Sequence, residues 1–253
     1  MAARHYPEFS DAPLRDAFDD TYRTLESGIK IHTDVVDLLI RRDEAIREGR
    51  ADPMILPVGV VGAAESGKDS IADAAETIGD DLPVEILRPS LSHPMKEIAI
   101  KYFGCDEDDV YTREGKESMA DTVQENGCDI THRRLLELIG DDLQKYDEMV
   151  LMRYSEKTIE SSDAYGKQPI MAFYPDLRTA PQEQYIRDVG GVVVYAQRNS
   201  AEATAEAQMG GAEAHHTKVY YQNADPDITL HNNSSYTDHL ARAAGLVHAV
   251  FTP

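Results

Sequence analysis

The amino-acid sequence predicts an α/β protein with a parallel five-stranded sheet and helices on both faces. From residue 53 onward, short apolar runs alternate with polar, helix-like stretches, which is typical of βαβ units. The chain has 253 residues, 42% of them hydrophobic, and is long enough to build the core of one large domain of this kind. The expected strands are residues 55–61, 84–87, 169–174, 192–197 and 227–230.

Residues 1–52 are expected to form a helical extension in front of a main domain that spans residues 53–253. Apolar residues recur at helical spacing in two stretches: Leu14, Phe18, Tyr22 and Leu25, then Val35, Leu39 and Ile46. Gly49 is a typical stop for the second helix. These helices could pack on the main domain, cover a contact between two copies of the chain in a homodimer, or recruit another partner.

Two segments of the main domain depart from the βαβ pattern. Residues 105–130 are acidic and aperiodic, and loops of this length are usually functional lids or disordered, so we expect a substrate-binding insert there. Residues 199–217 are rich in alanine with a Gly-Gly break, and we expect them to form a lid over bound phosphates.

The charge balance narrows the classes of partner. The chain has 25 basic and 46 acidic residues, a net charge of −21, which argues against general affinity for DNA, RNA or an anionic membrane. No apolar run approaches the roughly 18 residues that a membrane span requires. We therefore expect a cytoplasmic protein without a membrane partner, in which an anionic ligand needs a local basic site. Solubility or a high-salt habitat would also explain the charge.

The stretch "GAAESGKDS", from Gly62 to Ser70, nearly matches a phosphate-binding loop, in which Gly-Lys is followed at once by Ser or Thr. The apolar run before it predicts a strand, and the periodic residues after it predict a helix. Backbone N–H groups at the helix start would then face a phosphate, and Lys68 would reach it. The loop residues assigned to nucleotide binding are Gly62, Ala63, Ser66, Gly67, Lys68, Asp69 and Ser70. A plain turn with a surface lysine is the alternative.

Asp69 stands where the strict pattern has the hydroxyl that holds magnesium. A carboxylate is a good oxygen ligand for Mg²⁺, directly or through water. We therefore expect Asp69 to help hold the magnesium of a bound nucleotide, with Ser70 as a second ligand or a partner of an inner phosphate.

Four stretches, in this order, resemble the bacteriophage deoxynucleoside monophosphate kinases, whose loop often reads Gly-Lys-Asp-Thr/Ser. They are "GKDS" itself, "LSHPMKEIAIKYFG" (91–104), "THRRLLELIGDDL" (131–143) and "YPDLRTAPQEQYIRDVGGVVVYAQR" (174–198). The resemblance covers roughly residues 54–240 and implies ATP- and Mg²⁺-dependent conversion of a deoxynucleoside monophosphate to its diphosphate. Asp141 and Asp142 stand where the family has Thr-Glu, and an acidic residue expected near the C-terminus is lacking.

The residues expected to act on phosphates follow strand ends, where open α/β sheets bind ligands. Asp176 and Arg178 follow the third expected strand; the acid would orient the acceptor or a magnesium-bound water, and the arginine would clamp the acceptor phosphate. A local ion pair is the alternative for these two. The other candidates for the acceptor phosphate are Lys96, Lys116, Arg133 and Arg134. Because neighbouring residues on a helix point about 100° apart, only one of the two arginines should face the site.

Arg198 ends the fourth expected strand and begins the lid, where it would stabilise transition-state charge when the lid closes. The resemblance places the contact with the donor base after the last strand, at Asn233 or its neighbour Asn232. His215 and His216 are assigned no metal, because adjacent histidines do not share a helix face.

Two other functions remain open at this point. One is a kinase of the same superfamily that phosphorylates a hydroxymethylated pyrimidine within DNA, which the net charge of −21 disfavours. The other is a non-catalytic, nucleotide-gated binding module that uses residues 1–52 as its effector arm.

Overall fold

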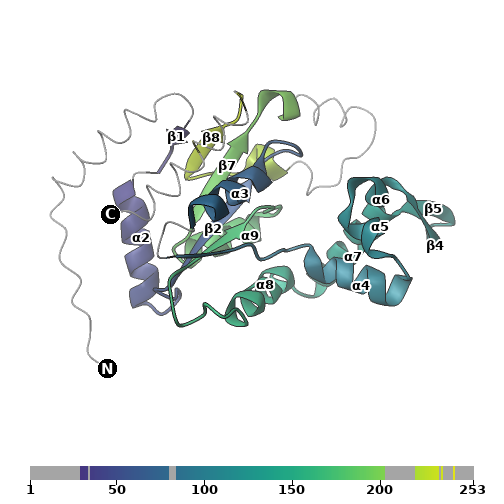
Figure 1. Cartoon of the computed structure of the whole chain (residues 1–253), viewed down its shortest axis with the longest axis horizontal. Helices are drawn as coiled ribbons and strands as arrows, with labels where there is room; N and C mark the ends of the chain where they lie inside the picture. Colours follow the sequence, from purple (N-terminus) through teal and green to yellow (C-terminus); the bar gives the residue numbers. More distant parts are fainter. Residues whose placement is uncertain are drawn as a thin grey trace.

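The computed structural model describes residues 29–33, 35–79, 84–202, 220–233, 235 and 242 (Figure 1). The first half of this part contains the elements β1 (Ile29–Ile31), α2 (Val35–Arg47), β2 (Ile55–Val61), α3 (Lys68–Gly79), β3 (Glu85–Leu87), α4 (His93–Phe103), α5 (Glu107–Tyr111), α6 (Arg113–Glu117), β4 (Met119–Glu125) and β5 (Cys128–Thr131). The second half contains α7 (His132–Tyr146), α8 (Val150–Glu160), β6 (Ile170–Tyr174), α9 (Ala180–Asp188), β7 (Val192–Gln197), the 3-10 helix η1 (Tyr220–Asn223) and β8 (Ile228–His231).

The main sheet has six strands in the order β1-β8-β7-β2-β6-β3. The five expected strands are all present and run parallel to one another, but β1 joins the β8 edge in the antiparallel direction. The prediction of a purely parallel five-stranded sheet is therefore wrong, because three residues ahead of the βαβ pattern pair with its last strand. A second, two-stranded antiparallel sheet, β4-β5, was not expected either.

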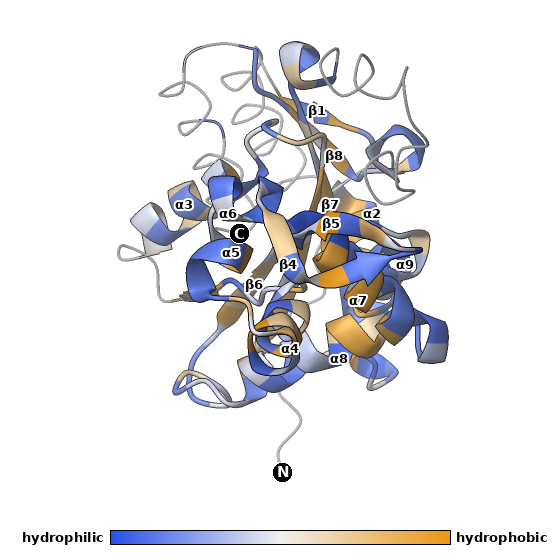
Figure 2. Ribbon diagram, turned by 90° about the vertical axis from the view of Figure 1, so that its right-hand side faces the viewer, coloured by the Kyte–Doolittle hydropathy of each residue, from blue (hydrophilic) through white to orange (hydrophobic). Residues whose placement is uncertain are grey.

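Successive side chains of the central strands point to opposite faces of the sheet, so the core has two layers. Val58 and Val60 of β2 and Phe173 of β6 face α3, whereas Ala172 and Tyr174 of β6 face α8 and α9. Both faces of these strands are thus covered, which explains why they read as nearly continuous apolar runs. Figure 2 shows the same distribution as hydrophobic colour along the strands of the sheet.

The insert is folded rather than a lid-like or disordered loop. Val110, Ala120 and Ile130 are buried against Leu135 and Ile139 of α7, in a hydrophobic cluster separate from the two layers of the sheet. The elements of the insert are two short helices and a hairpin, so its buried residues recur with neither a helical nor a strand period in the sequence. In Figure 1, α4 to α7 and the β4-β5 hairpin lie together at one end of the molecule.

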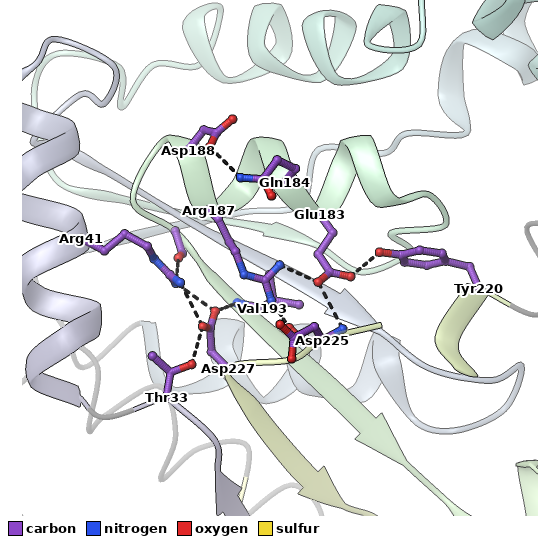
Figure 3. A network of polar contacts seen from close by, with 11 residues as sticks. Thr33, Arg41, Glu183, Gln184, Arg187, Asp188, Val193, Tyr220, Asp225 and Asp227 are labelled. Carbon is purple, nitrogen blue, oxygen red and sulfur yellow. Dashed lines mark hydrogen bonds and ion pairs between the residues drawn. The ribbon is translucent and has the colours of Figure 1, made fainter. Parts of the chain in front are cut away.

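Residues 29–47 are tied to the sheet through the carboxylate of Asp227 (Figure 3). Its two oxygens accept hydrogen bonds from Thr33 Oγ1 at 2.9 Å, Arg41 Nη1 and Nη2 at 3.0 and 2.9 Å, and the Val193 N–H at 2.8 Å. This segment therefore contains a strand that joins the sheet and a helix that packs on it, whereas the sequence predicted only helices there.

The buried side of α2 also differs from the prediction. Leu38 and Ala45 are buried, whereas Leu39, which was expected to face the core, is 55% exposed. The arginine between the buried positions explains the difference, because Arg41 points its guanidinium toward the core, where its Nη atoms donate to Asp227 and to the Gly191 carbonyl. The helix expected before residue 29, most of the lid at 199–217 and both adjacent histidines lie outside the described residues.

Candidate phosphate-transfer site

The turn between β2 and α3 has the backbone of a phosphate cradle. A Cβ atom on Gly62 would lie 2.5 Å from Ser66 Oγ and 2.6 Å from the Ala196 carbonyl oxygen, so only glycine fits there. Gly67 has φ +95° and Glu65 has φ +64°, left-handed values that curl the loop back on itself. Ser66 is fully buried, and its hydroxyl has no hydrogen-bond partner within the described part of the chain. The loop therefore keeps polar groups turned inward, as a site for a polar ligand requires.

Lys68, the first residue of α3, folds over this loop. Its Nζ donates to the carbonyl oxygens of Gly62 at 3.0 Å and Ala63 at 2.9 Å. Burial lowers the pKa of Lys68, and the carboxylates of Asp176 and Asp69 oppose that effect. The ammonium group is thus held over the helix N-terminus, where a phosphate would be bound.

Asp176 and Arg178 form an ion pair directly after β6. Arg178 Nε and Nη2 both contact Asp176 Oδ2, at 2.8 and 2.5 Å, and the two side chains are 38% and 43% exposed. Burial alone would raise the pKa of Asp176, but Arg178, Lys68 and Lys116 together lower it below its usual value. This carboxylate therefore remains ionised in a setting with more cations than it can pair.

Three further basic residues come from separate elements: Lys96 and Lys116 lie within electrostatic reach of Asp176, and Arg133 lies within reach of Lys116. Lys96 is on α4, Lys116 on α6 and Arg133 on α7. Burial lowers the pKa of Lys116, Arg133 and Arg178 lower it further, and Asp176 and Asp69 oppose them. Burial likewise lowers the pKa of Lys96, with Lys116 acting in the same direction and Asp176 against it. The helices α4, α6 and α7 thus bring these cations near Asp176, which follows the carboxyl end of β6.

The two neighbouring arginines of α7 bind different partners. Arg133 Nε donates to Glu117 on α6 at 2.6 Å and contributes to the field at Lys116. Arg134 instead forms a double hydrogen bond with Glu125 of the β4-β5 hairpin, at 2.8 and 2.7 Å. The Thr131 hydroxyl caps the helix by accepting from the Arg134 N–H and so fixes which residue faces which side. Arg133 therefore belongs to the candidate site, and Arg134 holds the hairpin.

Asp69 and Ser70 lie in the first turn of α3, at the rim of the site. The Asp69 side chain is 81% exposed, 3.7 Å from Arg88, and its charge acts on Lys68. In the described ranges, no three His, Cys, Asp or Glu side chains gather as a ready-made metal site. Magnesium in nucleotide sites is held by one or two carboxylates together with phosphate oxygens and water. The chemistry of Asp69 and Asp176 fits that mode.

Arg198, expected in the lid, and Asn232 and Asn233, expected at the donor base, lie near the loop from Gly62 to Ser70. Arg198 donates to the Glu65 carbonyl at 3.2 Å. Asn233 accepts from the Asn199 N–H at 2.9 Å, so it holds the start of the lid. Its neighbour Asn232 is buried and donates to the Ser66 carbonyl at 2.9 Å, so it supports the phosphate loop.

Sequence reasoning missed Arg113 and Arg88. Arg113 of α6 forms an ion pair with Glu65 at the loop tip, and Arg88 contacts Asp69 and Asp73 of α3. Arg113 lies three residues before Lys116, on the same side of a short helix, and that spacing was a usable signal. Arg88 follows the short strand β3 directly, so the strand-end rule could have selected it.

Comparisons with protein-family models and with curated protein sequences find no match to this chain. All helices in the described part of the chain are too short or too polar to cross a lipid bilayer.

Proposed function

We propose that this protein uses ATP and Mg²⁺ to convert a deoxynucleoside monophosphate into its diphosphate. The observation that carries the proposal is the meeting of Lys68, Lys116 and Arg178 around Asp176, next to a glycine-built loop at the start of a helix. Phosphoryl transfer needs alignment and positive charge rather than covalent chemistry from the protein. The resemblance to the bacteriophage deoxynucleoside monophosphate kinases supports the choice of acceptor.

In the proposed reaction, an oxygen of the acceptor 5′-phosphate attacks the γ-phosphorus of ATP. A new phosphorus–oxygen bond forms, the bond to the β,γ-bridging oxygen breaks, and ADP leaves. Lys68 exchanges its carbonyl partners, Gly62 and Ala63, for oxygens of the β- and γ-phosphates. When bound, Mg²⁺ neutralises charge on the same oxygens, and Asp69 and Asp176 would hold it directly or through water.

The acceptor phosphate is assigned to Arg178, Lys116, Arg133 and Lys96. Two of these cations already have acidic partners, because Arg178 pairs with Asp176 and Arg133 with Glu117. A phosphate group can accept from both arginines while these pairs persist, since each guanidinium carries five N–H donors. These two ion pairs hold the guanidinium groups in place, and the two lysines add positive charge, so an acidic protein has a local anion site here.

An acceptor panel tests this proposal. Purified protein is mixed with ATP and Mg²⁺, with each natural and hydroxymethylated deoxynucleoside monophosphate in turn, and with DNA that contains hydroxymethyluracil. The expected result is ADP together with a nucleoside diphosphate for at least one free monophosphate. Phosphate on the DNA alone would replace the proposal with the DNA-modifying kinase, and tight ATP binding without turnover would replace it with the nucleotide-gated module.

A further inference from the structure

A cavity of about 160 Å³ lies on the face of the sheet that α8 and α9 cover. Its wall includes Arg42 of α2, Ile55 and Pro57 of β2, and Tyr174 of β6. Ile55 is the first residue of β2, and the phosphate loop follows the last one, so the cavity opens away from the candidate site. A cavity of about 150 Å³ holds one benzene molecule, which sets the size of ligand that fits.

The cavity presents hydrogen-bond acceptors for which the described part of the chain supplies no donor. Tyr174 is 2% exposed and lines the cavity, yet its hydroxyl makes no hydrogen bond with any described residue. Glu156 and Glu160 lie one turn apart on α8, line the same cavity, and form no ion pair or hydrogen bond within the described ranges. Burial and the nearby Glu160 raise the pKa of Glu156, and burial and Glu156 raise that of Tyr174. Tyr174 and Glu156 are thus incompletely solvated neighbours, whereas Glu160 is exposed.

The two arginines of the wall are anchored by hydrogen bonds to the protein. Arg42 donates to the carbonyl oxygens of Val189 at 3.0 Å, Asp52 at 2.6 Å and Ile55. Arg50 donates to Glu48 and to the Asp188 carbonyl. These bonds hold both guanidinium groups in place, whereas Glu156 and the Tyr174 hydroxyl can accept from a ligand that carries donors, and the charge of Glu156 disfavours an anion.

Tyrosine rings make up much of the remaining wall, from Tyr165, Tyr174 and Tyr185. Aromatic faces attract cations, most strongly where water is excluded. We propose that this cavity binds a small organic cation, a primary amine on an aromatic stem. Its ammonium group donates to Glu156 and to the Tyr174 hydroxyl, and its stem packs on the tyrosine rings. The site is independent of phosphoryl transfer.

The test compares benzylamine with benzyl alcohol and benzoate, which share its ring and differ in the charge of the head group. Binding to the full chain is measured by isothermal titration calorimetry. Benzylamine is expected to bind with a Kd of about 1 mM, as ligands of this size do. Benzyl alcohol is expected to bind about tenfold more weakly, and benzoate more weakly still. Equal or tighter binding of benzoate, or no benzylamine binding at about 10 mM, would overturn the proposal.

Two conservative variants locate the site. Tyr174→Phe removes only the hydroxyl that lacks a partner, and Glu156→Gln removes one charge; each is expected to weaken benzylamine binding about fivefold to tenfold. The matched controls are Tyr146→Phe, at a tyrosine that is 92% exposed, and Glu148→Gln on the exposed surface. Both controls should bind as the wild type does. If the two cavity variants also bind benzylamine unchanged, the amine occupies another place and the inference is wrong.

Discussion

Two arginine–carboxylate pairs in this molecule lie at strand ends but are built differently. The Asp227 side chain is 2% exposed, and its oxygens accept from Arg41, Thr33 and the Val193 N–H (Figure 3). Asp176 is 38% exposed, and within the described residues it pairs with Arg178 and also lies in the field of Lys68 and Lys116. In the first pair every carboxylate lone pair has a matched donor, and in the second the cations outnumber the acid.

The difference separates a structural ion pair from a candidate ligand site. A buried carboxylate whose lone pairs all accept hydrogen bonds stabilises one arrangement of the chain and has no lone pair left for a ligand. A half-exposed carboxylate surrounded by surplus cations leaves donors that a phosphate can use. Changes near Asp227 should therefore reduce the stability of the fold, and changes near Asp176 should reduce phosphoryl transfer.

The largest effect is expected from Lys68→Ala. Removing the ammonium group that lies over the loop carbonyls should lower kcat/KM for transfer about a thousandfold, because the cation assigned to the β- and γ-phosphates is lost. The measurement is initial-rate kinetics with ATP and the best acceptor, beside a thermal unfolding curve. Lys167→Ala, at an exposed lysine, is the matched control and should keep full activity. A Lys68→Ala variant with near wild-type kcat/KM would remove this lysine from the mechanism.

Asp227→Asn should mainly reduce stability. Breaking this buried pair leaves Arg41 without its carboxylate, which costs about 3 kcal/mol and lowers the melting temperature by about 9 °C. Differential scanning calorimetry measures the change. Asp225→Asn, two residues away and exposed, is the control and should shift the melting temperature little.

The same residue predicts a pH dependence. Burial alone would raise the pKa of Asp227, but the bonds from Arg41, Val193 and Thr33 hold it below its usual value. The unfolded chain therefore binds a proton at a higher pH than the folded one does, so this contribution is present above the unfolded pKa and is lost as the pH falls through the folded pKa. Wild type and Asp227→Asn should converge in unfolding free energy at low pH. A constant difference at every pH would contradict the assignment.

The neighbours Arg133 and Arg134 allow a finer comparison within one helix. Arg133→Ala should raise the KM for the acceptor about tenfold, because it removes a donor to the acceptor phosphate, and should leave the melting temperature unchanged. Arg134→Ala should leave the KM unchanged and lower the melting temperature slightly, because its bonds to Glu125 of the hairpin are lost. Steady-state kinetics and thermal unfolding of both variants measure the contrast, and the reverse pattern would show that the roles are exchanged.

The smallest effect is a shift of the pH profile in Asp69→Asn. Burial lowers the pKa of Lys68, and Asp69 is one of the carboxylates that oppose this. Without that carboxylate, Lys68 should lose its proton at a lower pH, so the alkaline limb of kcat/KM should move toward neutral pH at saturating Mg²⁺. Asp73→Asn, one turn further along α3 and also in contact with Arg88, should not move it. An unchanged alkaline limb of kcat/KM in Asp69→Asn would show that this carboxylate does not affect the pKa of Lys68.

The candidate site was predictable from the sequence because its signals are local. The loop from Gly62 to Ser70 lies between an apolar run and a periodic helix, and Asp176 and Arg178 follow a strand directly. Each of these can be read within about a dozen residues. The choice between Arg133 and Arg134 required the cap at Thr131 and the distant partner Glu125, which spacing alone does not supply.

The predictions that were wrong concern parts of the fold that depend on contacts between distant segments. β1 is three residues long, and its Ile29 pairs with Leu230 almost at the other end of the chain, so only pairing makes it a strand. The inward side of α2 was misjudged because Arg41 is polar by type yet completes a buried network with Asp227. The fold of the insert depends on a few scattered apolar residues that meet α7.

The most direct test of the central claim is transfer of label from [γ-³²P]ATP to a deoxynucleoside monophosphate. The wild type should place the label in the nucleoside diphosphate, and Arg178→Ala should do so about a hundredfold more slowly while its melting temperature is retained. Label that stays in ATP, or is released only as inorganic phosphate, with every free monophosphate and a folded wild-type protein would contradict the account.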